Sequence, residues 1–373
     1  MSVVKGWCPS AYKPMMSGDG LLVRVKPRLG LLTQSQSIAL SELSDRFGNG
    51  QIDLTSRANF QIRGVSEQDF PKLRDQLLEA QLIDADPILE ERRNIIVSPL
   101  WTPSDLTEQF YTALLGCLTE LPEMPAKIGY AIDTGATPML KDASADFRIE
   151  AGADHPFILR ADGATHGVPV TPDTVAEAVT TMVEWFVASN GNAVGRMSRL
   201  LSGDIQQPSE WTALPSGASK SQLNPGSTNE GVVFGVPFGR FEAKQLIELM
   251  KKSCATSLHA TPWRMVLLKS AVHAEVPGFL SEPAHVLNVA ACPGAPSCAA
   301  ATVATYPIAR ALAHRIDGSL HVSGCSKGCA RNATSSVTLI GRDGLFDIVL
   351  DGAADSVASH AGLSETQVLE MFA

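Results

Sequence analysis

Hydrophobic and polar positions near the start of the chain alternate with two different periods. Short stretches with a period of two predict strands, and longer stretches with the helical period predict helices. In order they are a strand at 21–26, a helix at about 35–47, strands at 52–55 and 60–64, and a helix at 67–82. Pro27 ends the first strand and Gly48-Asn-Gly50 ends the first helix. This β-α-β-β-α order predicts an α+β unit of the ferredoxin-like kind.

The same order of elements returns about two hundred residues later. It comprises a strand at 232–236, a helix at 242–254 and a strand at 264–268. Thr55 and Thr261, 206 residues apart, each open the last strand of their unit. Turns at Arg28-Leu-Gly30 and Gly239-Arg-Phe241 precede the helices. We therefore expect an internal duplication in which each half carries one further segment.

The further segments contain their own short elements. They are strands at 127–133 and 147–151 and a helix at 171–188 in the first half, with a helix at 299–314 and strands at 320–324 and 336–341 in the second. Residues 202–230 are rich in Ser, Pro, Gly and Asn. The resulting division is a lead-in at 1–20, a first repeat at 21–85, a segment at 86–215, a linker at 216–230, a second repeat at 231–283 and a last segment at 284–373.

Composition narrows the class of protein. The chain has 373 residues, 45% of them hydrophobic, which is enough for two or three globular domains. A net charge of -9 argues against nonspecific nucleic-acid binding. No apolar run approaches the roughly 18 residues of a membrane span, and Met1 to Met16 shows no secretory signal. Seven cysteines, an odd number, favour a reducing, cytoplasmic location.

Four of the cysteines gather in two short loops near the end of the chain. They form Cys292-Pro-Gly-Ala-Pro-Ser-Cys298 and Cys325-Ser-Lys-Gly-Cys329. Four thiolates suit a tetrahedral metal or an iron–sulfur cluster, and the wide first loop favours the cluster over zinc. Structural zinc and a disulfide pair remain the alternatives. The other three cysteines are interpreted as incidental thiols: Cys8, Cys117 and Cys254.

The cysteine pattern also resembles a known family. Ala-Cys-Pro-Gly-x3-Cys followed by Ser-Gly-Cys-x3-Cys-Ala is similar to the cluster signature of the nitrite/sulfite reductases. The resemblance implies that Cys292, Cys298, Cys325 and Cys329 hold a 4Fe-4S cluster. In the reductases the last of these cysteines, Cys329 by position, also touches the iron of a sirohaem. The resemblance also implies a duplicated reductase-like architecture, with two ferredoxin-like halves, a first tetrapyrrole-binding segment and a second, cluster-binding segment.

A second constellation consists of basic residues in the first half. Period-two alternation through Thr55-Ser-Arg57-Ala-Asn-Phe-Gln61-Ile-Arg63 places Arg57, Gln61 and Arg63 on one face of a strand. By itself such a row is an ordinary solvated edge. Its resemblance to a reductase motif implies that these three residues bind a tetrapyrrole, whose carboxylates match guanidinium donors. Further matches, in 22–26, 91–96 and 124–129, imply catalytic roles in an anion pocket for Arg24, Arg93 and Lys127.

Two features point to an oxygenase branch of the family. Gly129 stands where the reductases have a second lysine. The opening Cys8-Pro-Ser-x-x-Lys-Pro-Met15-Met-Ser17-Gly-Asp-Gly20 resembles that of the branch that hydroxylates C20 of precorrin-3A and closes a γ-lactone. The resemblance implies a reaction that uses O2 and a reductant, nominally NADH. It also implies a mononuclear non-haem iron in addition to the 4Fe-4S cluster. The alternatives are a sirohaem-dependent nitrite or sulfite reductase, and a non-enzymatic protein holding zinc or a sensing cluster.

Other ligand motifs are missing from the sequence. The eight histidines form no metal-binding signature, so each is interpreted as an ordinary core or surface residue and the ligands of a second iron stay unassigned. No G-x-G-x-x-G opens a βαβ unit. We therefore expect electrons from NADH to arrive through a separate reductase.

Overall fold

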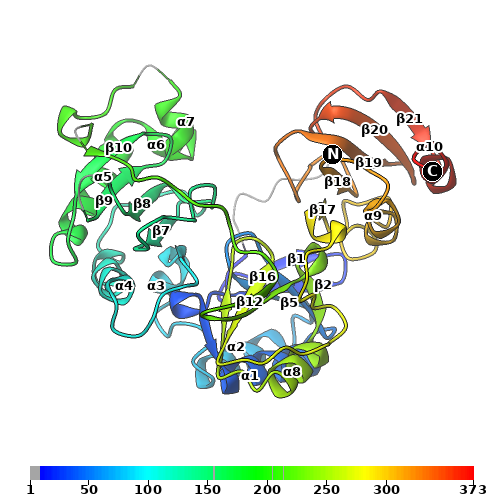
Figure 1. The fold of residues 1–373 in the computed structure, drawn as a ribbon, viewed down its shortest axis with the longest axis horizontal. Helices are drawn as coiled ribbons and strands as arrows, with labels where there is room; N and C mark the ends of the chain where they lie inside the picture. The colour runs from blue at the N-terminus through cyan, green and yellow to red at the C-terminus, as the bar shows by residue number, and fades with distance from the viewer. Residues whose placement is uncertain (1–8, 154–155, 204, 213) are drawn as a thin grey trace.

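The computed structural model describes residues 9–153, 156–203, 205–212 and 214–373. The expectation for Cys8 therefore lies outside the described residues. Within the described part of the chain, no helix is long and apolar enough to cross a membrane. Figure 1 shows a central body, with helices α1, α2 and α8 on one side, and two lobes that rise from it.

The central body contains the two repeats expected from the sequence. The first comprises β1 (Met15–Ser17), β2 (Gly20–Val25), η1 (Arg28–Gly30), β3 (Leu31–Thr33), α1 (Gln34–Phe47), β4 (Gln51–Leu54), β5 (Phe60–Val65) and α2 (Phe70–Glu79). The second comprises β12 (Gly226–Thr228), β13 (Gly231–Gly235), η3 (Pro237–Gly239), β14 (Arg240–Glu242), α8 (Ala243–Lys252), β15 (Ser257–Ala260) and β16 (Met265–Lys269). The duplicated α+β fold is confirmed.

The two repeats exchange a strand. One sheet has the order β1-β2-β5-β4-β14 and the other β12-β13-β16-β15-β3, so each contains a strand from the opposite repeat. Strand β14 pairs with β4, and β3 pairs with β15. Helices α1 and α8 pack against each other under both sheets, and one hydrophobic core spans both repeats. The central body is therefore a single folding unit.

Local backbone features repeat along with the strands. Leu29 and Phe238, both at positive φ (55° and 60°), turn the chain into the exchanged strands. A capping box follows each exchanged strand and begins the next helix. Thr55 and Thr261 lie in the turn before the last strand, and each side-chain oxygen accepts two backbone N–H bonds two and four residues on. The 206-residue spacing thus marks a true structural equivalence.

The lobes repeat a second pattern. The first lobe comprises α3 (Pro87–Arg92), β6 (Ile95–Val97), α4 (Leu106–Cys117), β7 (Tyr130–Asp133), β8 (Phe147–Glu150), β9 (Ile158–Ala161), β10 (His166–Pro169), α5 (Val175–Ala188), α6 (Gly191–Val194), α7 (Met197–Leu201), η2 (Ser209–Trp211) and β11 (Leu214–Pro215). The second comprises η4 (His285–Asn288), β17 (Val289–Ala291), α9 (Tyr306–Leu312), β18 (Leu320–Ser323), β19 (Ser335–Arg342), β20 (Leu345–Gly352), β21 (His360–Leu363) and α10 (Glu365–Met371).

The two lobe sheets share one topology. Their orders are β6-β7-β8-β9-β10-β11 and β17-β18-β19-β20-β21. In each, the first three strands are parallel, and the remaining strands are antiparallel. A helix lies between the first two strands, as βαβ connections require. The carboxyl ends of parallel neighbours meet at one edge, where side chains from separate loops can converge.

Several expectations differ from the structure. The strand expected at 127–133 begins at Tyr130, and the helix expected at 171–188 begins at Val175. The strand expected from Thr55 begins at Phe60, because 55–59 form a turn in which Ala58 has φ 54°. The helix expected at 299–314 is α9 alone, because residues 299–305 belong to the loop that returns from Cys298. Strands β1 and β12 lie within the stretches expected as lead-in and linker, where each forms a hairpin with the next strand.

Candidate functional site

The four clustered cysteines lie at one edge of the second lobe. Cys292 directly follows β17, and Cys325 comes two residues after β18. These strands are parallel neighbours, so their carboxyl ends bring the two loops together. Burial, and then the nearby thiols of Cys325, Cys292 and Cys298, raise the pKa of Cys329. The strand pairing thus brings the two cysteine loops to one edge, although no three His, Cys, Asp or Glu side chains of the described residues are arranged as ligands of one metal ion.

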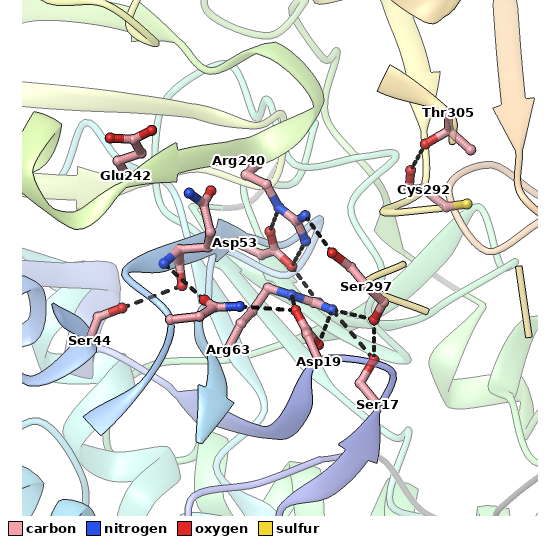
Figure 2. Close-up of polar contacts among 12 residues, drawn as sticks. Ser17, Asp19, Ser44, Asp53, Arg63, Arg240, Glu242, Cys292, Ser297 and Thr305 are labelled. Atoms are coloured by element: carbon pink, nitrogen blue, oxygen red, sulfur yellow. Dashed lines mark hydrogen bonds and ion pairs between the residues drawn. The ribbon is translucent and has the colours of Figure 1, made fainter. Parts of the chain in front are cut away.

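The cysteine loops are held by close backbone packing. The Gly324 N–H donates to Cys292 Sγ at 3.1 Å, and the Thr305 hydroxyl donates to the Cys292 carbonyl (Figure 2). A Cβ at Gly294 would lie 2.7 Å from Thr305 Oγ1, and one at Gly324 would lie 2.6 Å from Ala301 Cβ. Only glycine fits at these two points, so the loops pass each other at close range. The donor set of four thiols with an N–H···S bond fits an iron–sulfur cluster.

A row of polar side chains crosses the first central sheet. Register pairs Arg24 with Gln61, Gln61 with Asp53, and Asp53 with Arg240. Residues that face each other across strands share one side of a sheet. The alternate positions in these strands, such as Val23 and Ile62, are buried in the core above the helices. The polar row therefore lies on the sheet face that points away from α1 and α8.

Arg57 joins this face to the first lobe. It lies in the β4–β5 turn rather than on β5, so it does not share a strand face with Gln61 and Arg63 as expected. Its Nη2 donates to the Lys127 carbonyl at 3.1 Å and lies 3.4 Å from Ser144 Oγ. The same Lys127 carbonyl accepts from Arg196 at 2.6 Å. The Lys127 side chain itself is exposed.

Arg93 and Lys26 form a buried basic pair near Arg24. Arg93 is 3% exposed and donates to the Lys26 carbonyl at 2.8 Å and to Glu90 at 2.6 Å, and it also pairs with Asp84. The Lys26 ammonium donates to the carbonyls of Glu90 and Glu91. Burial lowers the pKa of Lys26 to about 7. The positive charges of Arg93, Arg24 and Arg57 lower this pKa as well, whereas the carboxylate of Glu90 raises it.

Lys26 was not assigned a role from the sequence. The sequence nevertheless indicated that Lys26 lies on the same side of the strand as Arg24, because it continues the alternation Leu22-Val-Arg24-Val-Lys26 just before Pro27. Arg196 and Arg240 were missed as well, since neither lies in a recognisable motif. Of the assigned residues, Arg24 and Gln61 lie on one face of the sheet, and Arg57, in the β4–β5 turn, contacts the Lys127 backbone.

Arg63 lies at the far end of the same face, next to the cysteines. It is 2% exposed, and its guanidinium binds Asp19, Asp53, Ser17 and the Ser297 carbonyl (Figure 2). The polar face thus reaches from the first lobe, at Lys127, to the cysteine edge of the second, at Ser297. The roles in catalysis and binding assigned from the sequence stay predictions at each of these positions.

The equivalent face of the second central sheet is apolar apart from His259, which pairs with Leu267. Its outward positions include Val233, Met265 and Leu267, which pack against Leu100, Leu223 and Trp263. The lobes differ in the same way. The Ser98 N–H bonds to the Ile132 carbonyl, just as the Cys292 N–H bonds to the Val322 carbonyl, so Ser98 takes the place of Cys292 in the first lobe. Within the described residues, the polar face is therefore found on one central sheet and the cysteine edge on one lobe, and neither feature is repeated in its counterpart.

Comparisons with known proteins agree with this architecture. Residues 13–80 match the nitrite/sulfite reductase ferredoxin-like half domain. The ferredoxin–nitrite reductase of Synechococcus elongatus is 23% identical over 90% of this chain and 78% of its own length. The solved structure of the Mycobacterium tuberculosis NirA protein matches with a TM-score of 0.60 and 17% identity, covering 94% of this chain and 79% of that one.

The fold and the matched half domain confirm the resemblance to the nitrite/sulfite reductase family. A second relative also matches over nearly the whole length of the chain. Precorrin-3B synthase from Sinorhizobium sp is 29% identical over 96% of this chain and 85% of its own length.

Proposed function

We propose that this chain is a precorrin-3B synthase, which hydroxylates C20 of precorrin-3A with O2 and closes a γ-lactone from an acetate side chain. The observation that carries the proposal is the polar face, found once within the described residues, which has Arg24 on it and reaches the cysteine edge at Ser297. Similarity to a precorrin-3B synthase along 96% of the chain supports this choice of substrate. The reaction balances when NADH, through a separate reductase, supplies two electrons and the second oxygen atom leaves as water.

The polar face, at the end near Arg24, has the chemistry needed to hold a polycarboxylate. Arg24, Arg57 and Lys127 supply positive charge, and Gln61 supplies an amide between them. Guanidinium groups bind carboxylates through paired N–H bonds, so several of them can fix the orientation of a flat macrocycle. In an acidic protein of net charge -9, such a local concentration of cations is what selects an anionic substrate. Arg93 acts near this face by holding Lys26 and Glu90 in place.

The cysteine edge has the donors for a 4Fe-4S cluster: Cys292, Cys298, Cys325 and Cys329. Such a cluster, when bound, supplies single electrons. The Gly324 N–H bonded to Cys292 stabilises a thiolate at that position. The family resemblance also implies a mononuclear iron.

The surroundings of Gly129 support oxygenase over reductase chemistry. A Cβ at this position would lie 3.1 Å from the Asn94 carbonyl, and the Gly129 N–H is bound to Asp146. The backbone is therefore packed where the reductases have a second lysine. A pocket for sulfite or nitrite needs a dense set of donors. A pocket for neutral O2 beside a bound polyanion does not.

The test is an oxygen-labelling experiment on anaerobically purified protein. With precorrin-3A, a reductant and labelled O2, one labelled atom should enter the product as the C20 hydroxyl, while the lactone ring oxygen stays unlabelled. Sulfite and nitrite should show negligible turnover with an artificial donor. Rapid reduction of sulfite or nitrite, without label in the tetrapyrrole, would favour the sirohaem-dependent reductase.

Iron and sulfide analysis tests the cysteine assignment separately. Replacing Cys292, Cys298, Cys325 or Cys329 with alanine should remove the broad absorption near ~400 nm of a cysteine-bound cluster. Cys117→Ala, in α4 of the other lobe, is the matched control and should keep full iron and sulfide. A variant of the four that retains both would contradict the assignment, and zinc without sulfide in the parent protein would favour a structural site.

A further inference from the structure

The Ser297 carbonyl, in the first cysteine loop, is bound by residues of the first ferredoxin-like half. The Ser297 carbonyl oxygen accepts from Ser17 Oγ at 2.7 Å and from Arg63 Nη2 at 2.8 Å (Figure 2). It also accepts from the Gly18 N–H at 3.2 Å. All three donors come from the first ferredoxin-like half, more than two hundred residues away in sequence. Ser297 is the residue before Cys298. We call Ser17, Gly18 and Arg63 the Ser297 clamp.

Arg63 is fixed in the direction of this carbonyl by two carboxylates. Its Nε and Nη2 donate to Asp19, and its Nη1 donates to Asp53, each at 2.9 Å. Asp53 also binds Arg240 at 2.6 and 3.0 Å. The buried Arg63 and the partly buried Arg240 are therefore balanced by two aspartates, with paired donors that fix the geometry. The Arg63 fork has no freedom to follow a displaced loop.

Gly18 brings the β1–β2 hairpin directly against the loop. A Cβ on Gly18 would lie 2.3 Å from the Pro296 carbonyl oxygen, 3.0 Å from Ala299 N and 3.2 Å from the Cys298 carbonyl carbon. All three atoms are backbone, so a side chain could be accommodated only by separating the hairpin from the loop. Gly18 has no positive φ, so alanine fits the hairpin itself and conflicts only with the contact.

We propose that Arg63 is a positioning residue for Cys298, and that the Ser297 clamp makes the order of the first cysteine loop depend on the first ferredoxin-like half. The second lobe supplies the thiol, whereas the first half supplies the contacts that keep its loop in place. The inference rests on the proposed function only in treating Cys298 as a cluster ligand. The clamp itself consists of contacts between protein atoms.

The experiment measures thiol alkylation in the metal-free protein, with each cysteine followed by peptide mapping. Arg63→Gln should raise the alkylation rate of Cys298 by about 10- to 100-fold, the factor for losing a charge-assisted hydrogen bond. Gly18→Ala should also raise this rate, because the added Cβ separates the hairpin from the loop. Cys117, in the other lobe, should keep its rate. Arg63→Lys should restore part of the protection, because it keeps the charge without the fork. Arg74→Gln is the matched control, since Arg74 lies on α2 and pairs with its neighbour Asp75.

Gly18→Ala removes no charge and no donor, so it separates the clamp from any general effect of losing a buried arginine. A second readout is the rate at which a chelator removes iron from the loaded protein, which both variants should increase. Unchanged Cys298 alkylation in folded Gly18→Ala and Arg63→Gln proteins would overturn the proposal. If Cys298 becomes reactive in both variants although the parent never binds iron and sulfide, the clamp stands and the proposed function fails.

Discussion

Lys26 is a buried cation whose charge changes close to neutral pH. It faces Glu90 from α3, and Arg24, Arg57 and Arg93 lie near it. Its ammonium binds two backbone carbonyls, bonds that a neutral amine can also donate. Because its pKa is about 7 in the folded protein, Lys26 is charged below this pH and neutral above it. The positive charge offered to a polyanion therefore depends on pH.

We predict that the affinity for a tetrapyrrole polycarboxylate falls as the pH rises from 6 to 8. The loss of the Lys26 charge should weaken binding by about 3- to 10-fold at low salt, a modest Coulomb effect for a buried charge near the binding face. Fluorescence-monitored titration of the metal-free protein would measure it. Lys26→Met should bind weakly at both pH values and lose most of this dependence. An equal pH dependence in Lys26→Met would assign the effect to another group.

Residue roles could be predicted where spacing alone constrains them. The four cysteines were found because C-x5-C and C-x3-C are rare and local. The environment of Arg63 could not be predicted, because its partners Asp19, Asp53 and Ser297 come from three distant parts of the chain. Arg57 was placed on the wrong element because a turn with one residue at positive φ preserves the apparent alternation. Sequence periodicity does not report such a turn.

Strand β15 contains a buried histidine, His259, whose ring packs on Trp101. Burial, and then Lys269, lower the pKa of His259 to about 4, although a hydrogen bond to the Pro99 backbone opposes the shift. The unfolded chain takes up this proton near pH 6.5, whereas the folded protein does not until about pH 4. The unfolded state therefore binds more protons in this window, and stability is lost as the pH falls through it.

His259→Gln should make the central sheets less sensitive to acid. In the parent protein, His259 lowers the free energy of unfolding by about 2 kcal/mol as the pH falls from 7 to 5. The variant should not show this decrease. Urea unfolding at the two pH values measures the difference. His360→Gln, on the exposed strand β21, should keep the parent's loss. The same loss in His259→Gln would show that His259 is not the group responsible.

Elements were predictable where one face is buried over several turns or strand positions. The amphipathic helices α1 and α8 and the alternating strands β2 and β5 follow from the sequence for this reason. The exchanged strands β3 and β14 have three residues each, too few to show a period. Their partners are set by the opposite repeat, so the exchange follows from tertiary structure alone.

At the scale of the whole molecule, neither half is complete without the other. Each central sheet lacks one strand if the halves are separated, and α1 loses its packing against α8. The chain can be cut between Ser221 and Gln222, in an exposed stretch after β11. We expect fragments 1–221 and 222–373 to be insoluble or unfolded when produced singly, because each exposes apolar core and a strand edge.

The two fragments should associate when produced together. Copurification and a single cooperative thermal transition, close to that of the intact chain, would be the expected result. Circular dichroism and size-exclusion chromatography of each fragment alone provide the comparison. A monomeric, cooperatively folded fragment would contradict the interdependence inferred from the strand exchange.

The strand exchange also bears on how the two halves came to differ. Identical copies on separate chains could close each other's sheets about a two-fold axis, and symmetry would then give every feature twice. Within one chain a substitution affects one half only. Cys292 and Ser98 occupy matching backbone positions, and Asp53 and His259 lie on matching strands. Covalent linkage thus allowed one face and one edge to specialise while their counterparts became supporting structure.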